Sequence, residues 1–185
     1  MTLDSPAQKY AAAKKRGRGP NFAAFESSFE FVLDDFQREA CLALEKGDSL
    51  LVAAPTGAGK TIVGEFAAHL AITNGTKCFY TTPIKALSNQ KYAEFCEIYG
   101  HQNIGLLTGD SSINGDADVV VMTTEVLRNM IYVRSSALEK LQYVVLDEVH
   151  YLSDKFRGPT WEEILIHLSD EVITISLSAT VSNIE

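Results

Sequence analysis

The sequence has few cysteines and no metal-ligand pattern. Its three cysteines, Cys41, Cys78 and Cys96, are widely spaced and form no C-x-x-C pair, and its four histidines show no metal-ligand spacing. We interpret the cysteines as reduced, buried, small apolar side chains, which argues against a redox role. A chain of 185 residues buries about two-thirds of the surface that its unfolded form exposes, so a single domain needs no disulfide or metal to stabilise its core.

Long apolar stretches are missing too. The sequence contains no run of about 18 apolar residues, the length expected of a membrane-spanning helix. Its start, MTLDSPAQKY, also lacks the apolar core of a signal peptide. We therefore expect a cytoplasmic protein that is not secreted and does not contact a membrane.

Basic residues are scarce and unevenly placed. The chain carries 16 Lys and Arg against 24 Asp and Glu, a net charge of -8. This balance argues against a broad basic surface for nucleic acid but does not exclude a narrow groove. Five of the basic residues lie in the first 20 positions. We expect residues 1–22 to form a flexible basic arm, either a solvated tail or an auxiliary phosphate contact, and residues 23–185 to form the domain.

What the sequence does contain is a series of short aliphatic runs separated by helical stretches. The runs span residues 49–54, 77–82, 104–110, 118–124, 142–148 and 172–180. Runs that are apolar on both faces and alternate with helices predict an α/β fold, in which a parallel sheet has helices on both faces. Ligands of such sheets bind beyond the carboxyl ends of the strands.

The first run leads into a candidate phosphate-binding loop. LVAAPTGAGKT lies between a predicted strand and a predicted helix, which is the context that such a loop requires. Gly57 and Gly59 allow backbone N–H groups to turn inward, and the helix N-terminus favours negative charge. Lys60 is predicted to reach the β- and γ-phosphates and Thr61 to bind Mg²⁺. The usual spacing would place glycine where the chain has Ala54, and the alternative interpretation is an ordinary glycine turn before a helix.

The fifth run ends in YVVLDEVH, a candidate site for metal and water. Asp147 ends a buried strand and would point at the metal from the same edge as the loop. Glu148 is the candidate to orient or deprotonate the attacking water. An Asp-Glu pair after an apolar strand is by itself more often a solvated strand end, but its coupling to the loop upstream favours a catalytic pair.

Three further polar clusters follow predicted strands. They are TTPIKALSNQK (81–91), TGD (108–110) and TTEVLRNM (123–130). Small residues, hydroxyls and amides at a helix start can hold backbone phosphates without a basic surface. The clusters could therefore line a track for one nucleic-acid strand. Helix capping is the alternative explanation for each of them taken alone.

Taken in order, these motifs resemble those of a known family. APTGAGKT, TTPIKALSNQK, TGD, TTEVLRNM, DEVH and SAT look like motifs I, Ia, Ib, the TTE segment, II and III of the superfamily 2 DExH-box helicases. PIKALSNQKY, MTTEVLRNM and RGPTWEE resemble the superkiller-type RNA helicases, most closely the bacterial HelY type, and the resemblance runs from about Phe29 to Glu185. It implies a RecA-like P-loop NTPase domain. In that family the first loop position is commonly alanine, which accounts for Ala54.

The resemblance implies ATP binding by the loop and by an adenine-reading segment, FVLDDFQ. In this segment Phe31 is implied to stack on the base and Gln37 to hydrogen-bond it, with packing and helix capping as the alternative. The implied loop residues are Ala54, Pro55, Thr56, Gly57, Ala58, Gly59, Lys60 and Thr61. Thr61 and Asp147 are implied to bind Mg²⁺.

The resemblance divides the remaining motifs among hydrolysis, coupling and strand binding. The implied catalytic residues are Lys60, Asp147, Glu148 and His150, and the implied coupling residues are Ser178, Ala179 and Thr180. The implied strand-binding residues are Pro83, Ile84, Lys85, Ala86, Gln90, Lys91, Thr108, Gly109, Asp110, Thr123, Thr124 and Glu125. Trp161, within RGPTWEE, is expected in the core.

The implied activity is that of an ATP-dependent RNA helicase with ATP and Mg²⁺ as cofactors. Its implied partners are single-stranded RNA or an RNA duplex with an overhang, with DNA as an alternative track. Family members use a second RecA-like domain to complete the ATP site, and this chain ends soon after SAT. We therefore expect these residues alone to bind Mg-ATP weakly and hydrolyse it little. The competing hypothesis is an ATP-responsive strand-binding or partner-docking module without motor activity.

Overall fold

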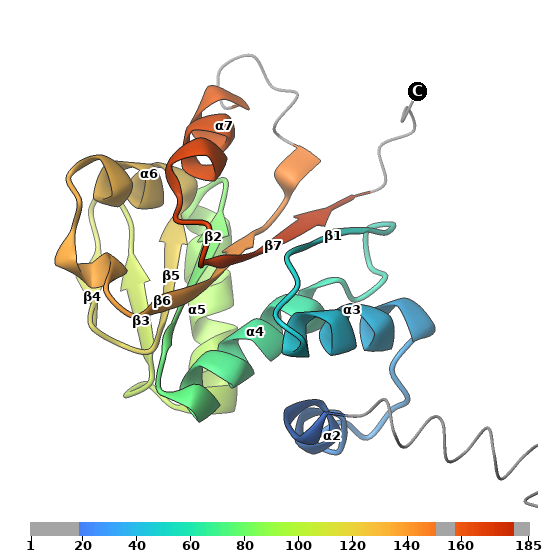
Figure 1. The fold of residues 1–185 in the computed structure, drawn as a ribbon. Helices are drawn as coiled ribbons and strands as arrows, with labels where there is room; N and C mark the ends of the chain where they lie inside the picture. Colours follow the sequence, from blue (N-terminus) through green and yellow to red (C-terminus); the bar gives the residue numbers. More distant parts are fainter. Residues whose placement is uncertain (1–18, 151–157, 180–185) are drawn as a thin grey trace, which may run out of the picture.

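A seven-stranded sheet runs through the computed structural model of the chain, which describes residues 19–150 and 158–179 (Figure 1). The strands are β1 (Leu50–Ala53), β2 (Lys77–Thr82), β3 (Ile104–Leu107), β4 (Ser112–Ile113), β5 (Val119–Thr123), β6 (Leu141–Leu146) and β7 (Ile173–Ser178). Their order across the sheet is β1-β7-β6-β2-β5-β3-β4. All neighbours pair in parallel except β3 and β4, which are antiparallel. The predicted parallel sheet is confirmed, and β4 is a short edge strand that the sequence analysis did not predict.

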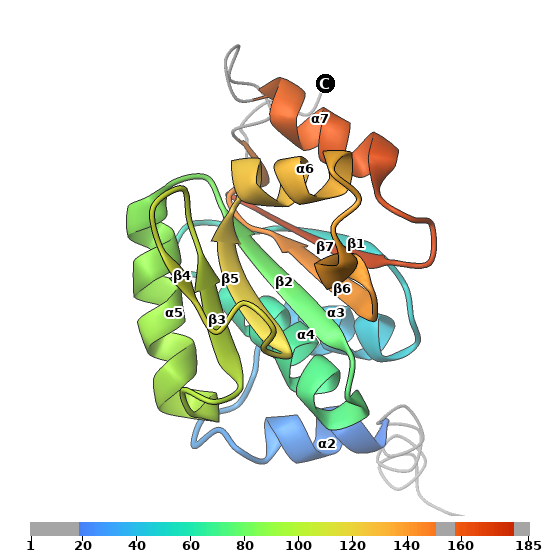
Figure 2. The ribbon, with the colours of Figure 1, turned by 90° about the vertical axis from the view of Figure 1, so that its left-hand side faces the viewer.

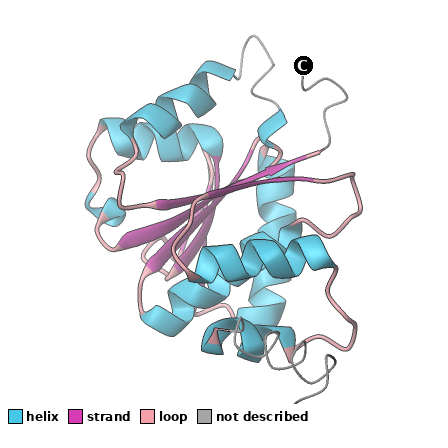
Figure 3. Cartoon of the chain, turned by 45° about the vertical axis from the view of Figure 1, so that its right-hand side comes forward, coloured by secondary structure: helices cyan, strands magenta, loops and turns pink. Residues whose placement is uncertain are grey.

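Helices cover both faces of this sheet (Figures 2 and 3). One face carries α2 (Pro20–Glu26), α3 (Asp35–Glu45), α4 (Thr61–Asn74) and α5 (Lys85–Tyr99). The other face carries α6 (Thr124–Tyr132), a 3-10 turn at Ser136–Leu138 and α7 (Gly158–His167). Within the described ranges, no helix is long and apolar enough to cross a membrane.

The strands of the sheet supply two separate cores because successive side chains point to opposite faces. In β5, Val119 and Val121 belong to the core on the α2 to α5 side, whereas Val120 and Met122 belong to the core under α6 and α7. Trp161 lies in the second core with 1% of its surface exposed, as expected. The three cysteines are free and buried, also as predicted.

Helix α2 lies where the sequence analysis placed the end of the basic arm. Its residue Phe22 is fully buried, and the Phe22 and Phe66 rings lie edge to face with centroids 5.8 Å apart. The Glu45 carboxylate accepts the backbone N–H of Asn21 at 2.9 Å. Residues 20–22, which the sequence assigned to the end of the arm, therefore pack against the folded domain. The boundary of the domain stays a prediction. Residues 1–18 of the predicted arm lie outside the described residues.

Candidate nucleotide site

Five polar segments meet at the carboxyl edge of the sheet because the strands that precede them are parallel. Ala53 is paired with Ser178, and the N–H of Ala54 donates to the carbonyl of Ser178 at 3.2 Å. The N–H of Asp147 donates to the carbonyl of Thr81 at 3.0 Å. The hydroxyl of Thr124 donates to the carbonyl of Thr82 at 3.1 Å. Segments far apart in the sequence thus become neighbours at one edge.

The predicted phosphate loop connects β1 to α4. Gly57 and Gly59 adopt positive φ angles of 85° and 74°, a backbone region that favours glycine, so the loop turns tightly into the helix. The Lys60 ammonium folds back over the loop and donates to the carbonyls of Ala54 at 2.7 Å and Pro55 at 3.0 Å. The loop is therefore a tight turn whose lysine ammonium is bound to loop carbonyls, and phosphate binding by this loop stays a prediction.

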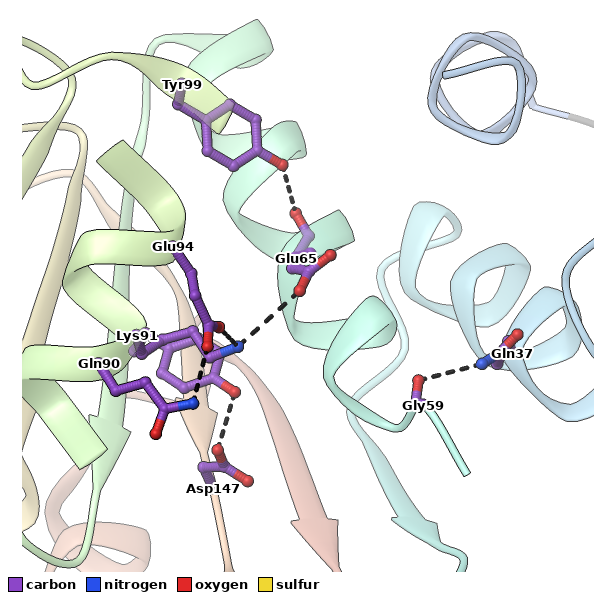
Figure 4. Close-up of polar contacts among 9 residues, drawn as sticks. Gln37, Gly59, Glu65, Gln90, Lys91, Glu94, Tyr99 and Asp147 are labelled. Atoms are coloured by element: carbon purple, nitrogen blue, oxygen red, sulfur yellow. Dashed lines mark hydrogen bonds and ion pairs between the residues drawn. The ribbon is translucent and has the colours of Figure 1, made fainter. Parts of the chain in front are cut away.

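Gln37 links helix α3 to this loop (Figure 4). Its carbonyl oxygen accepts the N–H of Asp34 at 2.8 Å, completing a capping box, and its amide donates to the carbonyls of Gly59 at 3.1 Å and Ala58 at 3.3 Å. The capping that the sequence analysis gave as the alternative is present. Phe31 is 57% exposed, and its ring centroid lies 5.2 Å from that of Phe29. Base recognition by Phe31 and Gln37 stays a prediction.

The Asp147 carboxylate is held by hydrogen bonds to both oxygens. Tyr80 donates its hydroxyl to Oδ2 at 2.9 Å, and the N–H of Glu148 donates to Oδ1 at 2.9 Å. Burial raises the pKa of the Asp147 carboxyl, and the hydrogen bond from Tyr80 opposes that rise. Glu148 has a left-handed backbone with φ 55°, and its Oε2 lies 3.1 Å from Nδ1 of His150. A non-glycine residue in this region carries strain, which functional sites often store.

Thr61, Asp147 and Glu148 line one cavity of about 270 Å³. A hydroxyl and a carboxylate are the hard oxygen ligands that Mg²⁺ prefers, and the metal at a nucleotide site takes its other ligands from phosphates and water. The residues present therefore fit a nucleotide-bound Mg²⁺. Among the described residues, no group of three His, Cys, Asp or Glu side chains could hold a metal by itself.

The predicted strand-binding residues divide by exposure. Seven of them are exposed: Ile84, Lys85, Ala86, Gln90, Gly109, Asp110 and Glu125. An ion pair between Lys85 and Asp110 joins the first two clusters at the surface. The other five are buried: Pro83, Lys91, Thr108, Thr123 and Thr124. Lys91 is buried, and its ammonium lies between the carboxylates of Glu65 and Glu94. Strand binding by these twelve residues stays a prediction.

The predicted coupling residues are described only in part. The hydroxyl of Ser178 donates to the carbonyl of Ala179 at 2.8 Å, and Ser178 is buried beside the loop. Thr180 lies outside the described residues. No sequence motif marked Tyr80, whose hydroxyl binds Asp147, although a tyrosine in a buried aliphatic strand carries a hydroxyl that needs a partner.

Comparison with known proteins places the chain among helicases. Residues 34–185 match the DEAD/DEAH box helicase family. The chain is 64% identical over 163 residues to "Probable helicase HelY" of Mycobacterium leprae, covering 88% of this chain and 18% of that protein. It is 53% identical over 163 residues to "DExH-box ATP-dependent RNA helicase DExH15 chloroplastic" of Arabidopsis thaliana, covering 85% of this chain and 14% of the relative. The chain thus spans less than a fifth of the length of these relatives.

A solved structure shares the fold. The crystal structure of the DUF1998 helicase MrfA bound to DNA and AMPPNP aligns with 90% of this chain and 27% of that chain. The TM-score is 0.73 and the sequence identity 24%. At this identity the likeness establishes the fold alone.

Proposed function

Because the chain belongs to the DEAD/DEAH box helicase family, we propose that it is the ATP-binding domain of an ATP-dependent RNA helicase. In this proposal, ATP hydrolysis at the sheet edge drives movement along one nucleic-acid strand. The observation that carries it is the meeting of the loop end at Thr61 with Asp147 and Glu148 around one cavity. The name of the Arabidopsis relative supports RNA as the track.

Each part of the edge has a separate task in this proposal. The Lys60 ammonium exchanges the carbonyls of Ala54 and Pro55 for phosphate oxygens, so a flexible cation is already at the loop when ATP binds. Thr61 and Asp147 would hold Mg²⁺, which would supply positive charge against the phosphates. Glu148 accepts the proton of the attacking water, and His150 orients the Glu148 carboxylate.

We propose that the ATP site is completed by a second RecA-like domain that is not among these 185 residues. The length of the relatives supports this, since the chain covers 18% of the Mycobacterium leprae protein. Without the second domain, the charge on the γ-phosphate in the transition state lacks part of its stabilisation. The chain by itself is therefore expected to bind Mg-ATP weakly and turn it over slowly.

The proposal is tested by measuring Mg-ATP binding and phosphate release with and without single-stranded RNA. Lys60→Ala is expected to lose nucleotide binding, since it removes the cation at the phosphates. Lys46→Ala, which changes an exposed lysine after α3, is the matched control and should bind like the wild type. Equal ATP affinity in the Lys60→Ala and wild-type chains would contradict the proposal. Fast RNA-stimulated release by the wild-type chain would contradict the need for a second domain.

The choice of RNA over DNA is tested separately by competition between strands of matched sequence. The exposed candidates, such as Lys85 and Gln90, are suited to phosphates, which both nucleic acids share. A preference for RNA would require a contact to the 2′-hydroxyl. Equal competition by the two strands would leave the proposed helicase activity in place but extend its substrates to DNA.

A further inference from the structure

A buried hydroxyl sets the position of the candidate metal carboxylate. Tyr80 lies in the middle of β2 and is fully buried, and its hydroxyl donates to Oδ2 of Asp147, just after β6, at 2.9 Å. The other oxygen, Oδ1, accepts the N–H of Glu148. Since both oxygens accept a hydrogen bond, the Asp147 carboxylate has one preferred orientation before a metal binds.

Behind Tyr80 lies a charged cluster between α4 and α5. The Lys91 ammonium is 5.8 Å from the centroid of the Tyr80 ring and 5.5 Å from that of Phe95. It donates to Oε2 of Glu94 at 2.5 Å and lies 3.9 Å from Oε1 of Glu65. Lys91 thus links α4 and α5 beside the ring of Tyr80, whose hydroxyl binds Asp147.

The cluster borders the same cavity as the nucleotide residues. Gln90, Lys91 and Glu94 line it on the α5 side, opposite Thr61 and Asp147. Gln90 donates to Oε1 of Glu94 at 2.9 Å, so each carboxylate oxygen of Glu94 has a partner. Burying a lysine ammonium costs several kcal/mol unless paired charges offset that cost. The burial of Lys91 between two carboxylates therefore has an energetic cost that packing alone does not explain.

We propose that Tyr80 and Lys91 are positioning residues for the metal at this site: Tyr80 orients the Asp147 carboxylate, and Lys91, fixed by Glu94 and Glu65, holds the Tyr80 ring in place. Lys91 therefore acts on Mg²⁺ binding and not on a nucleic-acid strand. The inference rests on the proposed function in one respect, because it requires that Asp147 receive Mg²⁺ together with a nucleotide.

The first test is the effect of Tyr80→Phe on Mg²⁺ binding. A fluorescent ATP analogue is titrated into the chain in EDTA and then at increasing Mg²⁺ concentration. Losing an outer hydrogen bond to a metal ligand typically weakens metal binding by about tenfold or more. Tyr80→Phe is therefore expected to raise the half-saturating Mg²⁺ concentration by about tenfold and to leave the affinity in EDTA unchanged.

Tyr99→Phe is the matched control. Its hydroxyl donates to the backbone carbonyl of Glu65 at 3.1 Å, so the variant also removes one tyrosine hydrogen bond beside α4, but none to Asp147 (Figure 4). It should leave the Mg²⁺ dependence unchanged. Equal Mg²⁺ dependence in Tyr80→Phe and the wild type, or an equal loss in Tyr99→Phe, would overturn the role of Tyr80.

The second test distinguishes the proposed positioning role of Lys91 from the strand-binding role that the sequence implied. Lys91→Gln is expected to raise the half-saturating Mg²⁺ concentration, because it loosens the support of a metal ligand, and to leave RNA affinity in EDTA unchanged. Weaker RNA binding with an unchanged Mg²⁺ dependence would overturn the inference and assign Lys91 to nucleic-acid binding. Far-ultraviolet circular dichroism and thermal melting check that each variant folds, and Tyr80→Phe, which keeps its ring, tests the inference even if Lys91→Gln does not fold.

Failure of this inference is distinguishable from failure of the proposed function by the Lys60→Ala variant. If Lys60→Ala abolishes nucleotide binding and Tyr80→Phe does not change the Mg²⁺ dependence, only the inference fails. If Lys60→Ala binds nucleotide like the wild type, the proposed function fails first.

Discussion

Glu65 places a carboxylate between α4 and α5, where little water reaches it. Burial raises the pKa of Glu65 above its reference value of 4.5; Lys91 at 3.9 Å opposes that rise and Glu94 adds to it. A raised pKa in the folded state means that the ionised form costs folding free energy. The contribution of the neutral Glu65 carboxyl to folding stability is therefore fully present below about pH 4.5 and is lost as the pH rises through the folded-state pKa of Glu65.

Glu65→Gln is therefore expected to be more stable than the wild type at pH 8 and to lose this advantage as the pH falls towards 4.5. A single-site effect of about 1 kcal/mol would raise the melting temperature by about 2–4 °C in a domain of this size. The measurement is thermal unfolding at pH 8 and pH 5.5, with Glu97→Gln, an exposed position on α5, as the control. A stability advantage that grows as the pH falls would contradict the sign of the pKa shift.

Helix α4 lies close to the sheet, and Gly64 permits that approach. A Cβ atom at this position would lie 2.8 Å from Cε2 of Tyr80 and 3.2 Å from Cγ1 of Val145. Eight of the fourteen residues of α4 are buried, because the helix lies between the sheet and its neighbouring helices. The helix therefore cannot move away from the sheet without disturbing other contacts.

Gly64→Ala is expected to destabilise the domain even though alanine favours a helix. Overpacking a core typically costs about 1–3 kcal/mol, while alanine in place of glycine gains about 1 kcal/mol of helix propensity. The net loss should lower the urea midpoint, and pressure on the Tyr80 ring should also weaken Mg²⁺ binding. Ala93→Gly, an exposed position on α5, shows the propensity effect alone. A more stable Gly64→Ala variant would mean that α4 can shift outward.

The charge of the whole molecule limits how it can bind a strand. The net charge is -8, and Lys85, the exposed lysine among the candidate strand residues, is paired with Asp110. Binding through hydroxyls, amides and backbone N–H groups releases few counterions, because such contacts neutralise no phosphate charge.

RNA binding by this chain is therefore expected to depend weakly on salt. Neutralising one or two phosphates of a single strand predicts a slope of log K against log salt of about -0.7 to -1.4. Fluorescence anisotropy at several salt concentrations measures the slope. A slope of about -4 would show a wide basic contact, and replacing Lys14, Lys15 and Arg16 by glutamine would test whether the predicted arm supplies it.

The sequence by itself determined the class of fold and the order of the motifs. Aliphatic runs and helical spacing are local properties of the chain, so the sheet and its main helices follow from them. Parallel strands end at one edge, so the loop before Lys60 and the pair at Asp147 could be predicted as neighbours from their places in the sequence.

Only the tertiary structure decided which side chains meet. Tyr80 and Asp147 are 67 residues apart, and Lys91 contacts Glu65 on another helix, so no local pattern marks either pair. Gln37 contacts the loop because α3 packs beside it, and Phe22 belongs to the core because α2 packs on Phe66. Buried charges and hydroxyls take the partners that packing brings within hydrogen-bond reach, and packing depends on the whole chain at once.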